Sequence, residues 1–386
     1  MNNIYFIESD KLNSFIDKLK NNYSVFTPVT KESNFTKETD YSYAKLPKGE
    51  PFVYNPYRVV EPLKSFFTYP KEQVTQYFGQ EDKITDLDKT IIFGVKSCDI
   101  AGHKVQDFVF LEGVEVDAST SSFDKLKDTS PERSRGTLSV NGEQSRTIDS
   151  LYSIRRENII FISSDCTGYK EVCFCLALEI LPHPTAGFDL NLSPLNDGYL
   201  VEVGSEKGEE LMALDKDSFL PAKATQISSR KTRRDNLIER LTRSLIPKNI
   251  PAKNSLQKLV KEGYAMDTWQ QFMRPCVECG GCNLICDTCH CFLLTDQRKD
   301  QQNEKVRVWD SCLYAAYARV AGGANPLRTR TQRLRNRFMK KFDFFVDNLG
   351  MPACCGCGRC IEVCPGKIDI REVLKDLAKK VIVESS

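Results

Sequence analysis

Eight cysteines in the C-terminal third of this 386-residue chain fall into two runs of identical spacing. Each run reads C-x2-C-x2-C-x3-C, and Pro365 directly follows the second. The chain holds sixteen cysteines but only three histidines, and twelve of the cysteines lie between Cys276 and Cys364. In a reducing compartment, clustered thiols bind metals or do redox chemistry more often than they form disulfides. The spacing therefore predicts iron–sulfur clusters.

The 2-2-3 spacing is typical of two-cluster segments of the bacterial ferredoxin type, in which the fourth cysteine of each run binds the other cluster. A tight loop can supply three corners of a cubane, and the fourth thiolate must come from elsewhere. We therefore predict two [4Fe–4S] clusters with crossed ligands. The first takes Cys276, Cys279, Cys282 and Cys364, and the second takes Cys354, Cys357, Cys360 and Cys286.

Structural zinc is the alternative, because zinc sites also use paired C-x2-C motifs. Zinc sites usually separate two cysteine pairs by a spacer, whereas each run here packs four cysteines together. Two features depart from a minimal ferredoxin: Asp287 stands where a proline would follow the first run, and residues 287–353 separate the two runs. We expect this insertion to be helical.

The insertion has chemistry of its own. Its Cys289, Cys291 and Cys312, with Asp310 or His290, could form a further metal site, or they could be buried thiols beside the clusters. The basic run from Arg328 to Lys341 is expected to be a solvated helix face or a docking surface for a partner subunit rather than a nucleic-acid site. Cys355 is interpreted as a variable position of the second run.

Four more cysteines lie in the N-terminal half. Cys98 and Cys166 lie at the ends of two apolar, β-branched runs, 89–99 and 158–166, that read as buried strands. Cys173 and Cys175 follow shortly after. Because a sheet can bring strand ends together, these four thiols favour a third iron–sulfur cluster, with zinc or four unrelated buried cysteines as alternatives.

The remaining patterns define the organisation of the chain. Residues 1–245 read as an α/β domain, in which the polar segment 117–147 is a mobile insertion. Residues 246–386 read as a ferredoxin-like domain that holds both clusters. A further strand is expected at 198–205, and a charged helix begins near Lys223.

Composition narrows the function. The formal net charge is +2, so no global field favours nucleic acid. The N-terminus lacks the pattern of a signal peptide, and no run has the roughly 18 apolar residues of a membrane helix. We therefore expect a cytoplasmic protein without a membrane span. No nucleophile triad, phosphate loop or dinucleotide fingerprint is present. The sequence therefore supplies groups that can carry electrons but no evident site for substrate chemistry.

The chain resembles the iron–sulfur β subunits of soluble sulfhydrogenases, which are cytosolic [NiFe] hydrogenases, and the A subunit of anaerobic sulfite reductase. The resemblance spans most of residues 91–370. Its motifs are "GVKSCD", "DSLYSIRREN", "CTGYKEVCFC", "YLVEVGSEKG", "WDSCLYAAYARVAGG" and "CCGCGRCIEVCPGKIDI".

The resemblance implies a non-catalytic electron-relay subunit of an oxidoreductase complex. Its implied partners are a subunit that carries FAD and handles NAD(P)H, and a catalytic subunit of the hydrogenase or sulfite-reductase type. Two alternatives stay open. The N-terminal domain could itself be catalytic, through a flavin or an open cluster site, or the chain could be a zinc-stabilised interaction module.

Overall fold

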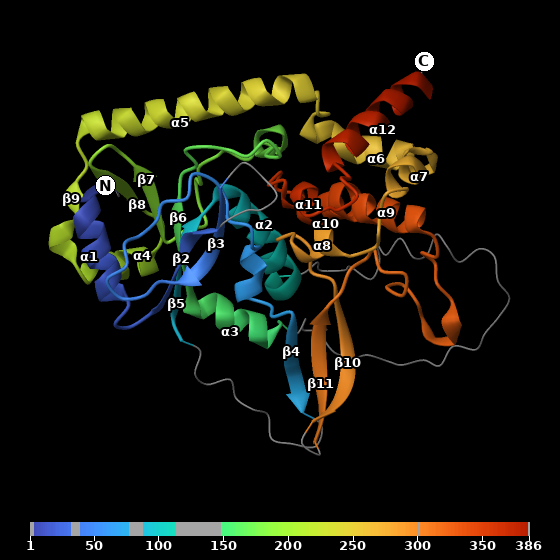
Figure 1. The fold of residues 1–386 in the computed structure, drawn as a ribbon, viewed down its shortest axis with the longest axis horizontal. Coiled ribbons are helices and arrows are strands. Elements are labelled where there is room, and N and C mark those ends of the chain that lie inside the picture. Colours follow the sequence, from blue (N-terminus) through green and yellow to red (C-terminus); the bar gives the residue numbers. More distant parts are fainter. Residues whose placement is uncertain (1–3, 32–38, 77–87, 113–147, 300–301, 385–386) are drawn as a thin grey trace, which may run out of the picture.

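A computed structural model describes residues 4–31, 39–76, 88–112, 148–299 and 302–384 (Figure 1). The insertion expected at 117–147 lies outside the described residues. Within them, no helix is both long and apolar enough to cross a lipid bilayer.

The N-terminal half is built on an eight-stranded mixed sheet with strand order β3-β2-β5-β6-β7-β8-β1-β9. Its strands are β1 (Ile4–Glu8), β2 (Ser24–Lys31), β3 (Asp40–Lys45), β5 (Thr90–Val95), β6 (Ile159–Ser164), β7 (Leu190–Pro194), β8 (Gly198–Val203) and β9 (Leu220–Pro221). The central strands β2, β5, β6 and β7 run parallel. Strands β5 and β6 are buried almost throughout, as expected for parallel strands covered on both faces. The strands predicted around 89–99, 158–166 and 198–205 are thus confirmed.

Helices cover both faces of this sheet. One face packs against α1 (Ser9–Leu19) and α4 (Glu206–Ala213), and the other against α2 (Ser97–Asp107) and α3 (Ser150–Asn158). The long helix α5 (Ala224–Leu245) extends from the sheet toward the C-terminal part (Figure 1). The N-terminal half is therefore α/β, as the sequence predicts.

The two cysteine runs fold into similar loops. Each leads into a one-turn helix, α8 (Gly281–Leu284) or α11 (Arg359–Glu362), whose preceding glycine has a positive φ: 70° at Gly280 and 74° at Gly358. Larger helices pack around the buried Trp269 beside these loops. They are α6 (Leu256–Glu262), α7 (Thr268–Met273), α9 (Arg330–Met339) and α12 (Ile370–Glu384).

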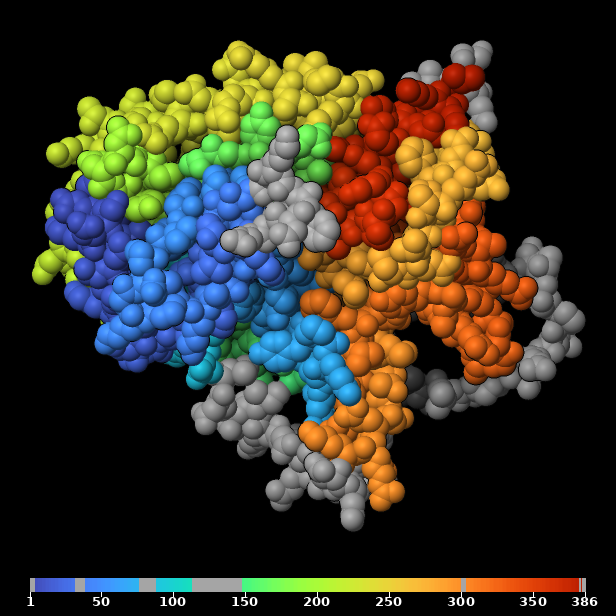
Figure 2. Space-filling model, in the orientation of Figure 1, coloured from blue at the N-terminus to red at the C-terminus, as the bar shows by residue number. Residues whose placement is uncertain are grey.

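The insertion at 287–353 is only partly helical. It begins with a hairpin of β10 (Phe292–Lys299) and β11 (Gln302–Trp309), and only later forms α9, a π-helical turn η10 (Lys340–Phe344) and α10 (Phe345–Leu349). Strand β4 (Lys71–Gln76), from the N-terminal half, pairs with β11 and completes a three-stranded sheet. Figures 1 and 2 show these strands extending from the body of the molecule. The insertion was expected to be helical, and the pairing of its strand β11 with β4 from the N-terminal half was not anticipated.

Candidate iron–sulfur centre

The first group of thiols lines one cavity between the two cysteine loops. Its members are Cys276, Cys279, Cys282 and Cys364, the four cysteines assigned to the first cluster. Three come from the first run and one from the second. Cys360 lines the same cavity from the neighbouring loop. The crossed arrangement expected from the spacing therefore fits the fold.

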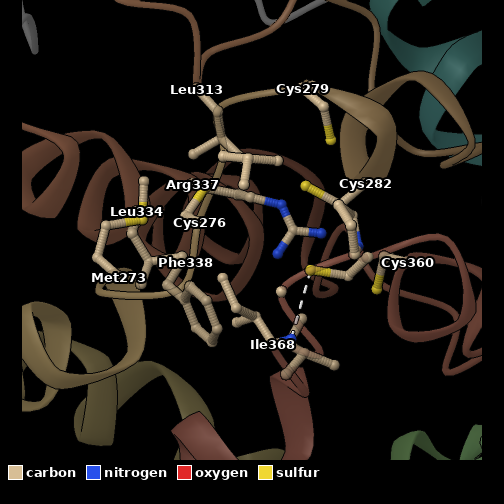
Figure 3. Close-up of a pocket in the computed structure, with 16 residues that line it drawn as sticks. Met273, Cys276, Cys279, Cys282, Leu313, Leu334, Arg337, Phe338, Cys360 and Ile368 are labelled. Carbon is tan, nitrogen blue, oxygen red and sulfur yellow. Dashed lines mark hydrogen bonds between the residues drawn. The ribbon is translucent and has the colours of Figure 1, made fainter.

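Backbone amides point at the sulfurs of this group. The N–H of Glu278 lies 3.4 Å from Cys276 Sγ, and the N–H of Ile368 lies 3.3 Å from Cys364 Sγ, the bond dashed in Figure 3. Glu278 reaches this position with a φ of 58°, in the left-handed region that side chains rarely adopt. Such bonds favour the thiolate that binds iron, and hydrogen bonds to cluster sulfurs tune the reduction potential.

Arg337 contributes a buried cation to the same cavity (Figure 3). Its Nε donates to Asn283 Oδ1 at 3.0 Å, whereas its Nη2 is buried without a hydrogen-bond partner among the described residues. Burial works against this charge, yet the pKa of Arg337 is raised because Cys282 and Cys360 outweigh the cost of burial. An orphaned guanidinium nitrogen aimed into a thiol-lined cavity fits an anionic occupant, and a [4Fe–4S] cluster held by four thiolates is an anion.

We expect Arg337→Gln to make the reduction potentials of both ferredoxin-type clusters more negative, because it removes a positive charge that stabilises the reduced state. The shift should be on the order of 100 mV, the effect of a unit charge about 6 Å away at an effective dielectric constant of about 20. Potentiometric titration followed by EPR would measure it. Arg335→Gln is the control, because Arg335 lies on the same helix but stacks on Tyr264 at the surface. Equal potentials in both variants would contradict the role of Arg337.

The second group of thiols comprises Cys354, Cys357, Cys360 and Cys286, and it is more buried than the first. Burial, together with the charges of its three companions, raises the pKa of Cys360 to about 12, although Arg337 opposes the rise. Burial likewise raises the pKa of Cys354 to about 11, with contributions from Cys286 and Cys357. The four thiols are thus close enough to act on one another. Ionising these buried thiols costs free energy, and iron offsets that cost because it binds the thiolate form and balances its charge.

Lys341 lies beside the second group. Its Nζ is 3.4 Å from Cys286 Sγ, 2.8 Å from Thr288 Oγ1 and 3.0 Å from the carbonyl of Ala353. Arg333, Arg337 and Lys341 are all buried. The expectation that the basic run 328–341 forms a solvated helix face is therefore wrong for these three residues. They contact the cysteine loops or the segment around Leu313 that packs beside them.

The four N-terminal thiols follow strands β5 and β6 in the chain. Cys98 lies in the first turn of α2, Cys166 follows β6, and Cys173 and Cys175 lie at the start of the 3-10 helix η4 (Cys175–Leu178). Burial raises the pKa of Cys166 to about 12, with Cys173 adding to the rise. Burial also raises the pKa of Cys175, to which both Cys173 and Cys166 contribute. Cys98 is linked to the other three through Cys166, whose charge helps to raise the pKa of Cys98 after burial, Asp99 and Cys357. A cluster shared by all four thiols stays a prediction.

This N-terminal group lies directly against the second cysteine loop. The N–H of Phe174 donates to the carbonyl of Gly356 at 2.8 Å. A Cβ on Gly356 would come within 2.6 Å of the Cys175 backbone, so only glycine permits this approach. Cys355, interpreted as a variable position, belongs to one buried cluster with Cys98 and Cys357. The thiol groups therefore form a contiguous series: N-terminal, second and first.

The three cysteines of the insertion line a further cavity of about 240 Å³. Cys289 lies next to Cys286, and Cys291 lies next to Cys312. His290 lines this cavity, whereas Asp310 does not. The cavity is thus bordered by three thiols together with Lys340 and Lys341.

The spread of these thiols bears on the zinc alternative. Among residues the structure describes, no three His, Cys, Asp or Glu side chains converge closely enough to hold one metal ion. A tetrahedral zinc needs its sulfurs each about 2.3 Å from a single point. A cubane instead places each thiolate on a different iron and holds the four farther apart. The two kinds of site therefore need different spacings of the sulfurs, and the iron, sulfide and zinc content of the protein distinguishes them.

A buried ion cluster that sequence reasoning missed ties the two halves together. Arg359, between two cysteines of the second run, pairs with Asp99 Oδ1 of α2 at 2.7 Å and with Asp287 Oδ2 at 3.0 Å. All three side chains are about 1% exposed. Asp287 also accepts the N–H of Lys64 at 3.1 Å. The aspartate that replaces the usual proline thus joins the first loop to the second loop and to the N-terminal half.

Comparison with known proteins defines the class of this site. Residues 275–368 match the family described as "4Fe-4S dicluster domain". This match covers both cysteine runs and the insertion between them. The chain is therefore an iron–sulfur protein with a dicluster domain in its C-terminal part.

A curated relative covers nearly the whole chain. Over 380 residues, 97% of this chain and 98% of the relative, it is 28% identical to "Sulfhydrogenase 2 subunit beta" of Pyrococcus furiosus. This similarity extends through the N-terminal sheet and agrees with the resemblance found in the motifs. No solved structure matches the chain.

Proposed function

We propose that this chain is the electron-transfer subunit of a cytoplasmic multi-subunit oxidoreductase. In this proposal it relays electrons between a subunit that binds FAD and handles NAD(P)H and a catalytic subunit of the hydrogenase or sulfite-reductase type. The relative's name, a sulfhydrogenase β subunit, supports a place in a complex. The chain itself makes no bond in the substrate.

The observation that carries this proposal is the contiguous series of thiol groups. The N-terminal group packs on the second loop through the bond between Phe174 and Gly356, and Cys360 of the second loop reaches the cavity of the first group. [4Fe–4S] clusters exchange one electron with little rearrangement when bound at such sites. The chain's own residues hold the thiolates, exclude water and place cations such as Arg337 and Lys341 beside them.

The ends of the series differ in access. Cys279 of the first group is exposed, whereas in the N-terminal group Cys98, Cys173 and Cys175 are buried and Cys166 is half-buried. An exposed end suits electron exchange with a partner subunit. We infer that the first group faces a partner and that the second group connects it to the interior.

We expect anaerobically purified protein to contain about twelve irons with matching acid-labile sulfide, four for each of three clusters. About sixteen would place a fourth cluster on Cys289, Cys291 and Cys312 together with a further ligand. About eight would limit the relay to the two ferredoxin-type clusters. Cys175→Ser should lower the iron content from about twelve to about eight. Zinc without sulfide would contradict the relay and favour the zinc-stabilised module.

A further inference from the structure

A basic cavity of about 240 Å³ lies where β6 and β7 end and α5 crosses the sheet. Asp165 and Cys166 border it from the end of β6, and Ser193 from β7. Helix α5 contributes four arginines, Arg230, Arg233, Arg234 and Arg240. In parallel sheets, ligands bind at the carboxyl ends of the strands, which is where this cavity lies.

Two of the four arginines are held in place by carboxylates. Arg234 Nε and Nη2 donate to the two oxygens of Asp165 at 2.8 and 3.0 Å, and Arg230 pairs with Glu202 at 2.8 Å. Both side chains are largely buried, at 17% and 11% exposed. Their guanidinium groups are therefore fixed before any ligand arrives.

The other two arginines, Arg233 and Arg240, are exposed, and no carboxylate offsets their charge among the described residues. Arg233 Nη2 donates to Asn196 Oδ1 at 2.5 Å, and Arg240 lies 5.8 Å from the ring of Tyr169. In the described part of the chain, no carboxylate pairs with either. The field of the cavity also reaches His183, whose pKa falls to about 4 through burial and then through Arg234 and Arg230. The cavity thus carries two positive charges that lack a partner.

We propose that this cavity binds the phosphoryl group of a small ligand, as a dianionic phosphate ester or as inorganic phosphate. Two unneutralised guanidinium groups match the charge of close to −2 that a phosphate monoester carries at pH 7. The planar fork of arginine suits phosphate oxygens, and fixed neighbours orient it. The volume accepts a phosphoryl group with a few further atoms but is smaller than the 300–1,000 Å³ or so of pockets for drug-sized ligands.

The position of the cavity links it to electron flow. Cys166 borders the cavity and also belongs to the N-terminal thiol group. A bound dianion would lie beside that group and disfavour added negative charge there. This coupling rests on the proposed relay, whereas the binding itself does not.

Calorimetric titration of the full, cluster-loaded chain with inorganic phosphate and with glycerol 3-phosphate, at constant ionic strength, tests the binding. We expect saturable binding that is at least tenfold weaker in Arg233→Gln/Arg240→Gln. Arg243→Gln is the matched control, because Arg243 lies on the same helix but pairs with Glu239 at the surface. Equal binding by the double variant and the wild type, equal affinity for succinate, or no binding at all would overturn the proposal. Loss of an acidic partner subunit from the double variant, without phosphate binding to the wild type, would overturn it in favour of a protein interface.

A redox titration separates this proposal from the relay. With saturating phosphate, the N-terminal cluster should shift to a more negative potential in the wild type and stay unchanged in the double variant. An unshifted potential in protein with about twelve irons would overturn the coupling. Phosphate binding to protein with about eight irons would instead remove the third cluster while leaving the phosphoryl site intact.

Discussion

Cys286→Ser is expected to remove the cluster of the second run while the cluster of its own run survives. Cys286 lies among Cys354, Cys357 and Cys360, whose pKa values its charge affects, whereas Cys276, Cys279 and Cys282 share their cavity with Cys364. Serine is a poorer ligand for iron than a thiolate. The iron content should fall by up to about four per chain, and EPR of the reduced protein should lose one of the two ferredoxin-type signals.

Two further variants assign the signals. Cys279→Ser identifies the signal of the first cluster, because Cys279 is assigned to that cluster, at the exposed end of the series. Cys355→Ser should keep both signals, since Cys355 is as buried as the ligands but stands outside both sets. If Cys286→Ser and Cys279→Ser remove the same signal, each run holds its own cluster and the crossed assignment is wrong.

The buried ion cluster predicts a large loss of stability. Arg359→Met leaves Asp99 and Asp287 buried and facing each other without a cation, in a place where burial already raises the pKa of Asp287. Removing one partner of a buried ion pair typically costs about 3–5 kcal/mol. The midpoint of urea unfolding, followed by circular dichroism under anaerobic conditions, should fall accordingly.

Compensating changes separate lost charge from lost packing. In Arg359→Met/Asp99→Asn/Asp287→Asn no buried charge remains, and replacing a whole buried ion cluster is often neutral, so much of the stability should return. Arg243→Ala, which breaks a surface pair with Glu239, should cost at most about 0.5 kcal/mol. If Arg359→Met unfolds at the wild-type midpoint, the ion cluster does not join the two halves.

Local patterns made much of this site predictable. The two cysteine runs predict the two loops, because the 2-2-3 spacing involves only residues that are close together in the chain. Cys98 and Cys166 were expected at the ends of two buried strands of one sheet, and the structure places them shortly after β5 and β6. The third cluster that they would share stays a prediction. The packing of Phe174 against Gly356 was not predictable, since it joins residues far apart in the chain and leaves no periodic signal.

The buried cations were missed for a different reason. Arg333, Arg337 and Lys341 recur every four residues and therefore share one face of the helix, a spacing that solvated faces also show. The signal that could have separated the two cases is the adjacent apolar row of Leu334, Phe338 and Phe342, all buried. A basic row next to the apolar stripe of a helix lies at the edge of the core, where it can reach buried thiolates.

The arrangement of the first cavity has a consequence for biosynthesis. Three of its thiols belong to Cys276, Cys279 and Cys282, but the fourth, Cys364, is synthesised 88 residues after Cys276. At about 5–20 residues per second, the ribosome needs roughly 4–18 s to cover that stretch. During this interval the first loop holds an incomplete set of reactive thiols. If the predicted first cluster takes these four thiols, its assembly must therefore wait until Cys364 has been translated, and a chain truncated before Cys364 would lack its fourth ligand.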